Sequence, residues 1–177
     1  MSATTEAWLS GPIEGVDPYL MPVAHALVQA GRDLEHATAE LTTAQLWARP
    51  GGAASIGFHL MHIAGVLDRL LTYARGEALS EAQFEALRAE GRPGEPPRDA
   101  AALLGDVRAA IDRALDQVRG TPRDTLLEPR AVGRKQLPST VLGLLYHAAE
   151  HATRHTGQAI TTAKVVRGST ESTTSGG

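Results

Sequence analysis

Histidines in two tight groups are the residues of this chain whose type and spacing could do chemistry. His59 and His62 form the first group, and His147, His151 and His155 form the second. Imidazole is the commonest protein ligand for zinc and related metals. Residues four positions apart lie on one helix face, so His151 and His155 can present two rings to a single ion. A third nitrogen from a facing helix would complete a three-histidine site and leave one position open for water or substrate.

Helical projection indicates which of these histidines face the interior. At about 100° per residue, His155 lies roughly 40° from the centre of its helix's apolar face, His151 roughly 80° and His147 roughly 120°. On the other helix, His59 lies roughly 60° from the centre of the apolar face and His62 roughly 120°. Projection therefore selects His151 and His155 as a pair, and it prefers His59 as the third ligand.

Other interpretations of the histidines are weaker. One histidine on an apolar helix face is usually a packed, hydrogen-bonded core residue, but several unpaired imidazoles in one interior would be costly, which favours a shared ion. The segment from His147 to His151 matches the inverted zinc-protease signature H-x-x-E-H, with Glu150 as general base. That enzyme also needs a distant acidic ligand downstream, where only Glu171 follows. A di-iron site needs Glu-x-x-His motifs, and the chain has none.

The composition excludes several other classes of function. The chain has no cysteine, which removes disulfides, thiolate metal sites and a cysteine nucleophile. A formal net charge of −3 argues against a nucleic-acid-binding protein, since such proteins are usually basic. No signal peptide and no membrane-spanning run are recognisable, so we expect no membrane partner and a cytoplasmic location.

Four segments with apolar residues at helical spacing must position the histidines. They predict helices over about 17–41, 55–76, 99–118 and 139–166. A short extra helix is expected over 80–90, and loops over 47–54, 92–98 and 120–138. The fold class expected is all-α, a four-helix bundle with long crossover loops.

The apolar stripes of these helices predict the core. The residues expected to be buried are Leu20, Val23, Leu27, Leu34, Leu41, Ile56, Leu60, Ile63, Leu67, Leu70, Ala74, Leu104, Val107, Ile111, Leu115, Val118, Val141, Leu145, Ala148, Ala152 and Ala159. We expect one domain over 17–167, with an N-terminal extension over 1–16 and a disordered Ser/Thr/Gly-rich tail over 168–177.

The chain resembles the DinB/YfiT-like superfamily of small four-helix metal-binding proteins over nearly the whole expected domain. The motifs that carry the likeness are Leu46-Trp47 with Pro50, Ser55-Ile56-Gly57 leading to His62-Ile63-Ala64, and His151-x3-His155 followed by Gly157-Gln158. The resemblance implies that the metal ligands are His62, His151 and His155. It conflicts with the projection on the choice between His59 and His62, and we follow the resemblance. His59, His147 and Glu150 then remain as extra ligands or as residues that contact the ligands.

The resemblance also implies a range of functions. One divalent metal ion, which imidazole ligands allow to be zinc, nickel or iron, would activate a low-molecular-weight thiol cosubstrate or water. The protein would be a thiol S-transferase or a hydrolase acting on a small-molecule substrate, and a homodimer; its catalytic residues are not identified. The alternative is a stress-related, non-enzymatic, metal-binding dimeric module. Glu150 and Arg154 are expected to pair on the helix surface, and Asp68 and Arg69 are expected to be exposed.

Overall fold

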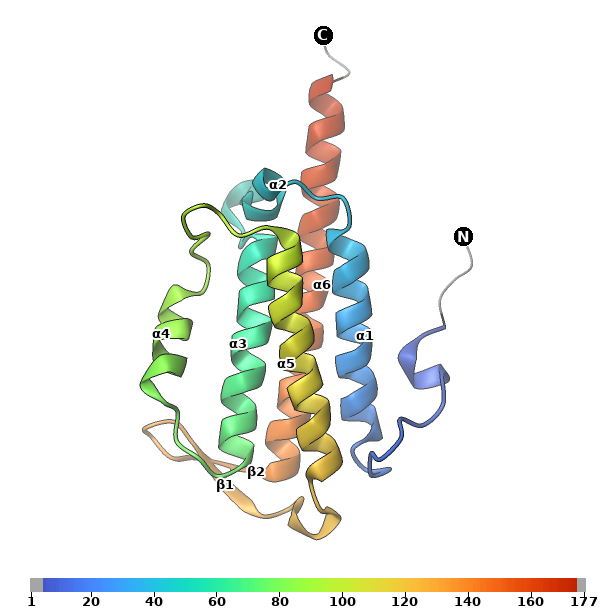
Figure 1. Cartoon of the computed structure of the whole chain (residues 1–177), viewed down its shortest axis with the longest axis vertical. Helices are drawn as coiled ribbons and strands as arrows, with labels where there is room; N and C mark the ends of the chain where they lie inside the picture. Colours follow the sequence, from blue (N-terminus) through green and yellow to red (C-terminus); the bar gives the residue numbers. More distant parts are fainter. Residues whose placement is uncertain (1–4, 175–177) are drawn as a thin grey trace.

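The computed structural model of the chain describes residues 5–174, with side chains up to residue 168, and it is mostly helical. In chain order the elements are η1 (Ala7–Leu9), α1 (Met21–Thr38), α2 (Thr43–Trp47), η2 (Pro50–Gly52), α3 (Ile56–Ala74), α4 (Glu81–Ala89), α5 (Ala100–Gly120), η3 (Arg123–Thr125), β1 (Pro129–Val132), β2 (Leu137–Thr140) and α6 (Val141–Thr174). The long helices α1, α3, α5 and α6 lie side by side, with α3 and α1 each packed against both α5 and α6 (Figure 1).

Side-chain caps explain where three of the helices begin. The hydroxyl of Ser55 accepts a hydrogen bond from the backbone N–H of Phe58 at 3.1 Å, at the start of α3. Asp99 caps α5 and Ser80 caps α4 in the same way. Each cap satisfies a backbone donor that has no partner inside the helix, and therefore favours the helix start at that residue. The predicted starts of these helices are confirmed.

One apolar cluster joins the four long helices. The predicted core residues are buried, with two exceptions: Leu41 and Leu104 are half-buried, and Leu103 takes the buried position in α5. The cluster contains both small and large side chains, and alanines of α6 such as Ala148 and Ala152 belong to it together with leucines. The small residues allow α6 to lie close to α3, which bears on the histidines that both helices carry. None of the described helices is long and apolar enough to cross a membrane.

The segment predicted as a loop over 120–138 contains regular structure that the sequence did not predict. It holds η3 and an antiparallel hairpin, β1–β2, in which Pro129 pairs with Thr140 and Val132 with Leu137. Gly133 and Gln136 adopt positive φ angles of 66° and 49° at the hairpin's turn. Strands of four residues are too short to show a clear alternation of apolar and polar residues, which explains why the pattern did not indicate them.

The bounds of α1 and α6 differ most from the predicted ones, and α1 begins at Met21 rather than near residue 17. The first helix, α1, ends at Thr38, and a separate short helix, α2, follows over Thr43–Trp47. The last helix, α6, continues to Thr174 and so enters the segment expected to be a disordered tail; residues 175–177 lie outside the described part. Extending an existing helix needs no new nucleation, so residues of modest helix propensity can continue it.

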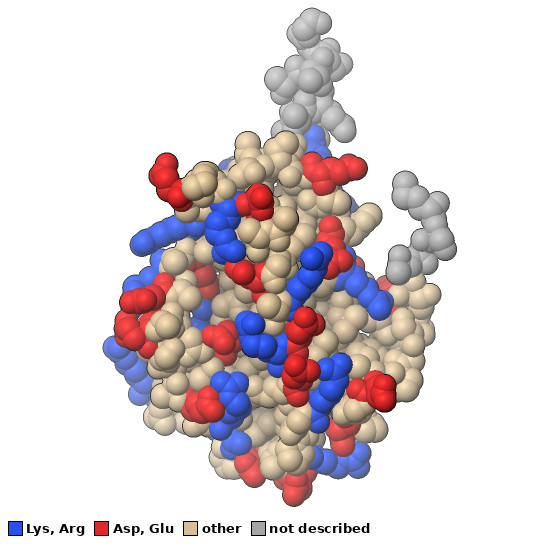
Figure 2. Space-filling model, viewed as in Figure 1, with Lys and Arg blue, Asp and Glu red and all other residues tan. Residues whose placement is uncertain are grey.

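Charged side chains of both signs are interspersed over the face of the molecule viewed in Figure 2. Several form ion pairs between elements, such as Arg108 of α5 with Glu35 of α1 at 2.6 Å. Exposed pairs of this kind contribute little to stability. The apolar cluster therefore carries most of the stabilisation of the fold.

Trp47 and Gly57 close one end of the core. The indole Nε1 of Trp47 donates a hydrogen bond to the carbonyl oxygen of Arg98 at 2.8 Å, which joins α2 to the loop before α5. A Cβ atom added at Gly57 would lie 2.8 Å from three carbons of the Trp47 ring. The indole therefore packs directly on the backbone of α3, and this contact gives a physical reason for both residues in the resemblance motif.

We predict that Gly57→Ala destabilises the protein, because the added methyl group displaces the Trp47 ring. The free energy of unfolding, measured by denaturant titration, should fall by about 1–3 kcal/mol. Gly105→Ala is the matched control, since no atom lies within 4 Å of a Cβ added there in α5. That substitution should raise the free energy of unfolding by roughly 0.5–1 kcal/mol through helix propensity. Equal effects of the two substitutions would contradict the packing described for Trp47.

Candidate metal centre

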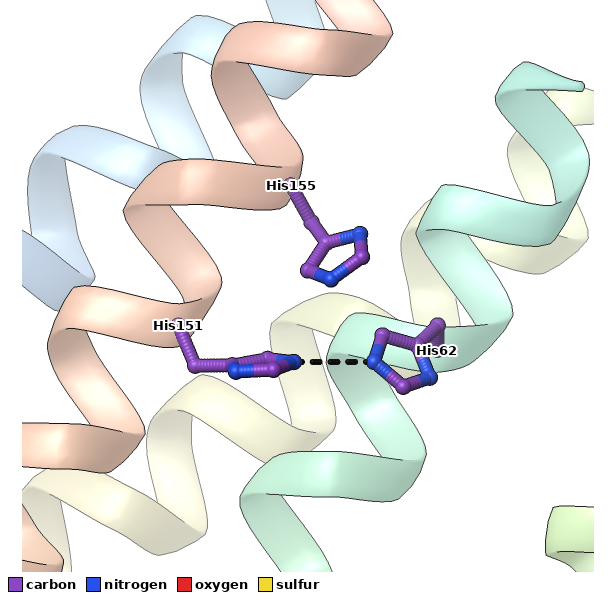
Figure 3. Close-up of side chains that lie close together, drawn as sticks. All are labelled: His62, His151 and His155. Carbon is purple, nitrogen blue, oxygen red and sulfur yellow. Dashed lines mark hydrogen bonds between the residues drawn. The ribbon is translucent and has the colours of Figure 1, made fainter. Parts of the chain in front are cut away.

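The packing of α3 against α6 brings three histidines together. One ligand nitrogen from each of His62, His151 and His155 lies within 4.8 Å of the other two, and all three side chains are partly buried. The Nε2 atoms of His62 and His151 are 2.9 Å apart. The ring of His155 lies 4.4 Å from that of His62 between centroids. Figure 3 shows the three rings turned toward one another from the two helices. We call these three residues the histidine cluster.

A buried ion pair orients the His62 ring. The Nδ1 atom of His62 lies 2.6 Å from Oε2 of Glu90, and the other carboxylate oxygen accepts a hydrogen bond from Arg69 at 2.7 Å. Only 7% of the Glu90 side chain and 10% of the Arg69 side chain are exposed. Because a carboxylate only accepts hydrogen bonds, Nδ1 of His62 is the donor. In the neutral imidazole the lone pair then lies on Nε2, the nitrogen that faces the cluster.

His59 contacts the cluster without joining it. Its Nδ1 atom lies 3.0 Å from Nδ1 of His155, and its side chain is 4% exposed. Burial, together with the nearby His62, lowers the pKa of His59 to about 4, and burial likewise lowers the pKa of His155 to about 4. Both rings are therefore neutral near pH 7, and one donates its proton to the other. The projection was right that His59 faces inward. Its ring, however, forms a hydrogen bond with His155 and is not one of the three rings that converge in the cluster.

The three rings form a donor set that fits a transition metal ion. Burial is the main cause that lowers the pKa of His151, as it does for His155, so both rings stay neutral near pH 7, and each keeps one nitrogen lone pair that could bind a metal ion. Imidazole nitrogens suit zinc, iron, nickel and copper, whereas magnesium and calcium prefer oxygen ligands. The Nδ1 atom of His151 is buried and has no hydrogen bond partner among the described residues, so packing and the contact of its Nε2 atom with His62 orient this ring.

His147 and Glu150 lie at the surface beside the cluster. They form a second possible metal-binding group with His151, in which His147 is exposed. The Glu150 carboxylate also pairs with Arg154 one turn away, as predicted, and that hydrogen bond lowers the pKa of Glu150. Since both groups use His151, and the second is open to water, the more buried group is the stronger candidate.

Two functional residues were missed by sequence reasoning. Arg69 was expected to be exposed, and this expectation is wrong, because its side chain is turned against Glu90 at the inner side of α4. Glu90 lies 28 positions from His62, and no fixed spacing connects them. A weak signal exists nevertheless: His62 and Arg69 are two helical turns apart and share a face of α3, so a cation beside a candidate ligand indicates that an acidic partner is near.

A hollow of about 510 Å³ opens beside the cluster, large enough for a small molecule. It is lined by Ala53, Ala54, Phe58, His59, Arg154, His155, Gly157, Gln158, Thr161 and Thr162. The Phe58 ring stacks on that of His62 at 5.3 Å between centroids and so covers the cluster from this side. A molecule in the hollow would lie against His155, which belongs to the cluster.

Comparison with protein-family models gives a match over most of the chain. The family model of the DinB superfamily matches residues 26–159, a range that includes all three histidines of the cluster and parts or all of the four long helices. No curated protein matches the chain.

We predict that Arg69→Met strongly destabilises the protein, because it leaves the Glu90 carboxylate buried without its cation. Removing one partner of a buried ion pair typically costs about 3–5 kcal/mol in the free energy of unfolding. Urea titration of the metal-free protein measures the change, with Arg113→Met as control, since Arg113 is exposed on α5. The control should change the free energy of unfolding by less than about 0.5 kcal/mol. If Arg69→Met lowers the free energy of unfolding no more than Arg113→Met does, the ion pair between Arg69 and Glu90 does not support the fold.

Proposed function

The chain belongs to the DinB superfamily, and on this premise we propose that His62, His151 and His155 hold one divalent metal ion. The observation that carries the proposal is the convergence of three partly buried imidazoles from two helices on one point. We also propose that α1, α3, α5 and α6 form the four-helix bundle of this superfamily. Zinc, nickel or iron would suit the three nitrogen ligands.

We propose further that the protein is an enzyme, a thiol S-transferase or a hydrolase. Among the described residues, no fourth His, Asp or Glu atom joins the histidine cluster, which leaves a coordination position for a thiol or a water molecule. An ion bound there would lower the pKa of that thiol or water and so generate the nucleophile. The chain has no cysteine, so a thiol would come from a low-molecular-weight cosubstrate.

The residues around the cluster would position the substrates. Phe58 covers one side of the cluster and limits the access of water, which strengthens electrostatic interactions within the site. The hollow beside His155 provides room for a small-molecule substrate. Arg154 is the one charged side chain among the described residues that line this hollow, and its guanidinium, which pairs with Glu150, would orient a polar group of that substrate.

The alternative proposal is a non-enzymatic, stress-related, metal-binding dimeric module. The observation in its favour is the position of His59, a buried ring in contact with His155. A shift of this ring toward the ion would close the site with a fourth nitrogen, as in structural metal sites. The homodimer stays a prediction from the resemblance in both proposals, as does the absence of nucleic-acid and membrane partners.

We predict that the purified protein binds close to one divalent ion per chain, measured by elemental analysis after dialysis. His62→Ala, His151→Ala and His155→Ala should each reduce the metal content to near zero, because two imidazoles hold an ion far more weakly than three. His36→Ala is the control, since His36 is exposed on α1 far from the cluster in sequence, and it should retain the metal. Full metal content in the three cluster variants would refute the site.

The proposed enzyme and the alternative module are separated by a second measurement. The zinc-, nickel- or iron-loaded protein is mixed with small thiols and electrophilic acceptors, and the consumption of free thiol is followed over time. We expect turnover that depends on the metal and disappears in His155→Ala. If every thiol and acceptor remains unconsumed while the metal content is complete, the S-transferase proposal fails, and hydrolysis of small esters and amides tests the hydrolase in the same preparation.

A further inference from the structure

The helix α4 is held to the rest of the molecule by polar contacts. None of its side chains is fully buried. Near its start, Gln83 donates hydrogen bonds to Asp68 at 2.7 Å and to Thr72 at 2.8 Å, both on α3. At its C-terminal end, Glu90 reaches the histidine cluster. Because little apolar surface is removed from water, the docking of α4 on α3 depends strongly on these contacts.

Gly65 makes the contact between Glu90 and α3 possible. A Cβ atom added at this position of α3 would lie 2.5 Å from Oε1 of Glu90 and 2.7 Å from Nη1 of Arg69. The carboxylate of Glu90 therefore rests against the bare backbone of α3, one turn after His62. Arg69 neutralises the charge of this carboxylate, which could not otherwise be buried at low cost. Gly65 and Arg69 thus form a socket for Glu90.

From this geometry we propose that Glu90 is the positioning residue of His62, and that it couples metal binding to the docking of α4. The proposal rests on the proposed binding of a metal ion by the histidine cluster. By accepting the Nδ1 proton of His62, Glu90 fixes both the orientation of the ring and the tautomer whose Nε2 faces His151. Residues that hold a metal-binding histidine in this way typically contribute 10- to 100-fold to metal affinity.

The coupling acts in both directions. If the docked Glu90 raises the affinity of the cluster for a metal ion by a given factor, the bound ion raises the docking equilibrium of Glu90 by the same factor. The helix α4 would then be held more tightly against α3 in the metal-bound protein than in the metal-free protein. The crossover between α3 and α5 is on this proposal a part of the metal centre, rather than only a connection.

The first test measures zinc affinity by competition with a chromophoric chelator. Glu90→Ala and Gly65→Ala should each weaken binding about 10- to 100-fold, while all three histidines remain. Gly65→Ala keeps both charges of the buried pair and so provides a result even where Glu90→Ala folds poorly. The matched controls are Glu85→Ala, an exposed position of α4, and Gly105→Ala, an open position of α5; both should bind as the unchanged protein does.

The second test measures hydrogen exchange of the α4 backbone amides, residues 81–89, with and without zinc. Zinc should slow this exchange in the unchanged protein and leave it unaltered in Glu90→Ala at saturating zinc. A merely structural role of Glu90 would not produce this dependence on zinc. If the unchanged protein binds zinc but all four variants bind it within twofold of one another, or if zinc leaves the exchange of α4 unaltered, the coupling is refuted. If the unchanged protein binds no zinc, the proposed metal site itself fails.

Discussion

The close packing of α3 against α6 is the constraint on which the candidate centre depends. It places four imidazole rings, those of His59, His62, His151 and His155, in a space where the access of water is limited. Charged imidazoles would repel one another there and would lose their hydration. Burial therefore holds the pKa of His59 and His155 near 4, and keeps their nitrogens free of the second proton near pH 7. The packing of α3 against α6 thus keeps these imidazoles in the neutral form, which is the form that can bind a metal ion.

The three rings of the cluster differ in the hydrogen bond partner of the nitrogen that faces away from the cluster. His62 has a carboxylate at its far nitrogen, His155 has the neutral ring of His59, and the Nδ1 atom of His151 has no hydrogen bond partner in the described part of the chain. These differences determine which nitrogen of each ring can face the cluster. They also show that the site extends beyond the two helices that carry its ligands, since the carboxylate comes from Glu90 at the end of α4.

Two glycines of α3 serve this arrangement in a similar way. Gly57 lets the Trp47 ring pack on the helix backbone, which fixes the segment before α3, and Gly65 lets the Glu90 carboxylate do the same one turn beyond the cluster. Neither position has a positive φ angle, so backbone conformation does not require glycine there. The requirement is the close approach of another group, and in both cases that group belongs to a segment that crosses between long helices.

The sequence by itself determined the four long helices, the starts of α3 and α5, nearly all of the buried positions, and the histidines worth considering. These features are local, because helical periodicity and capping depend on residues only a few positions apart. Between His59 and His62, projection favoured His59 and only the family resemblance pointed to His62; the tertiary structure places His62 in the cluster. Projection measures how far a residue points inward from its own helix, whereas membership depends on where α6 and α4 lie. For the same reason the partnership of Glu90 with His62 and Arg69, and the pairing of β1 with β2, could not be predicted: each joins residues whose proximity only the folded chain establishes.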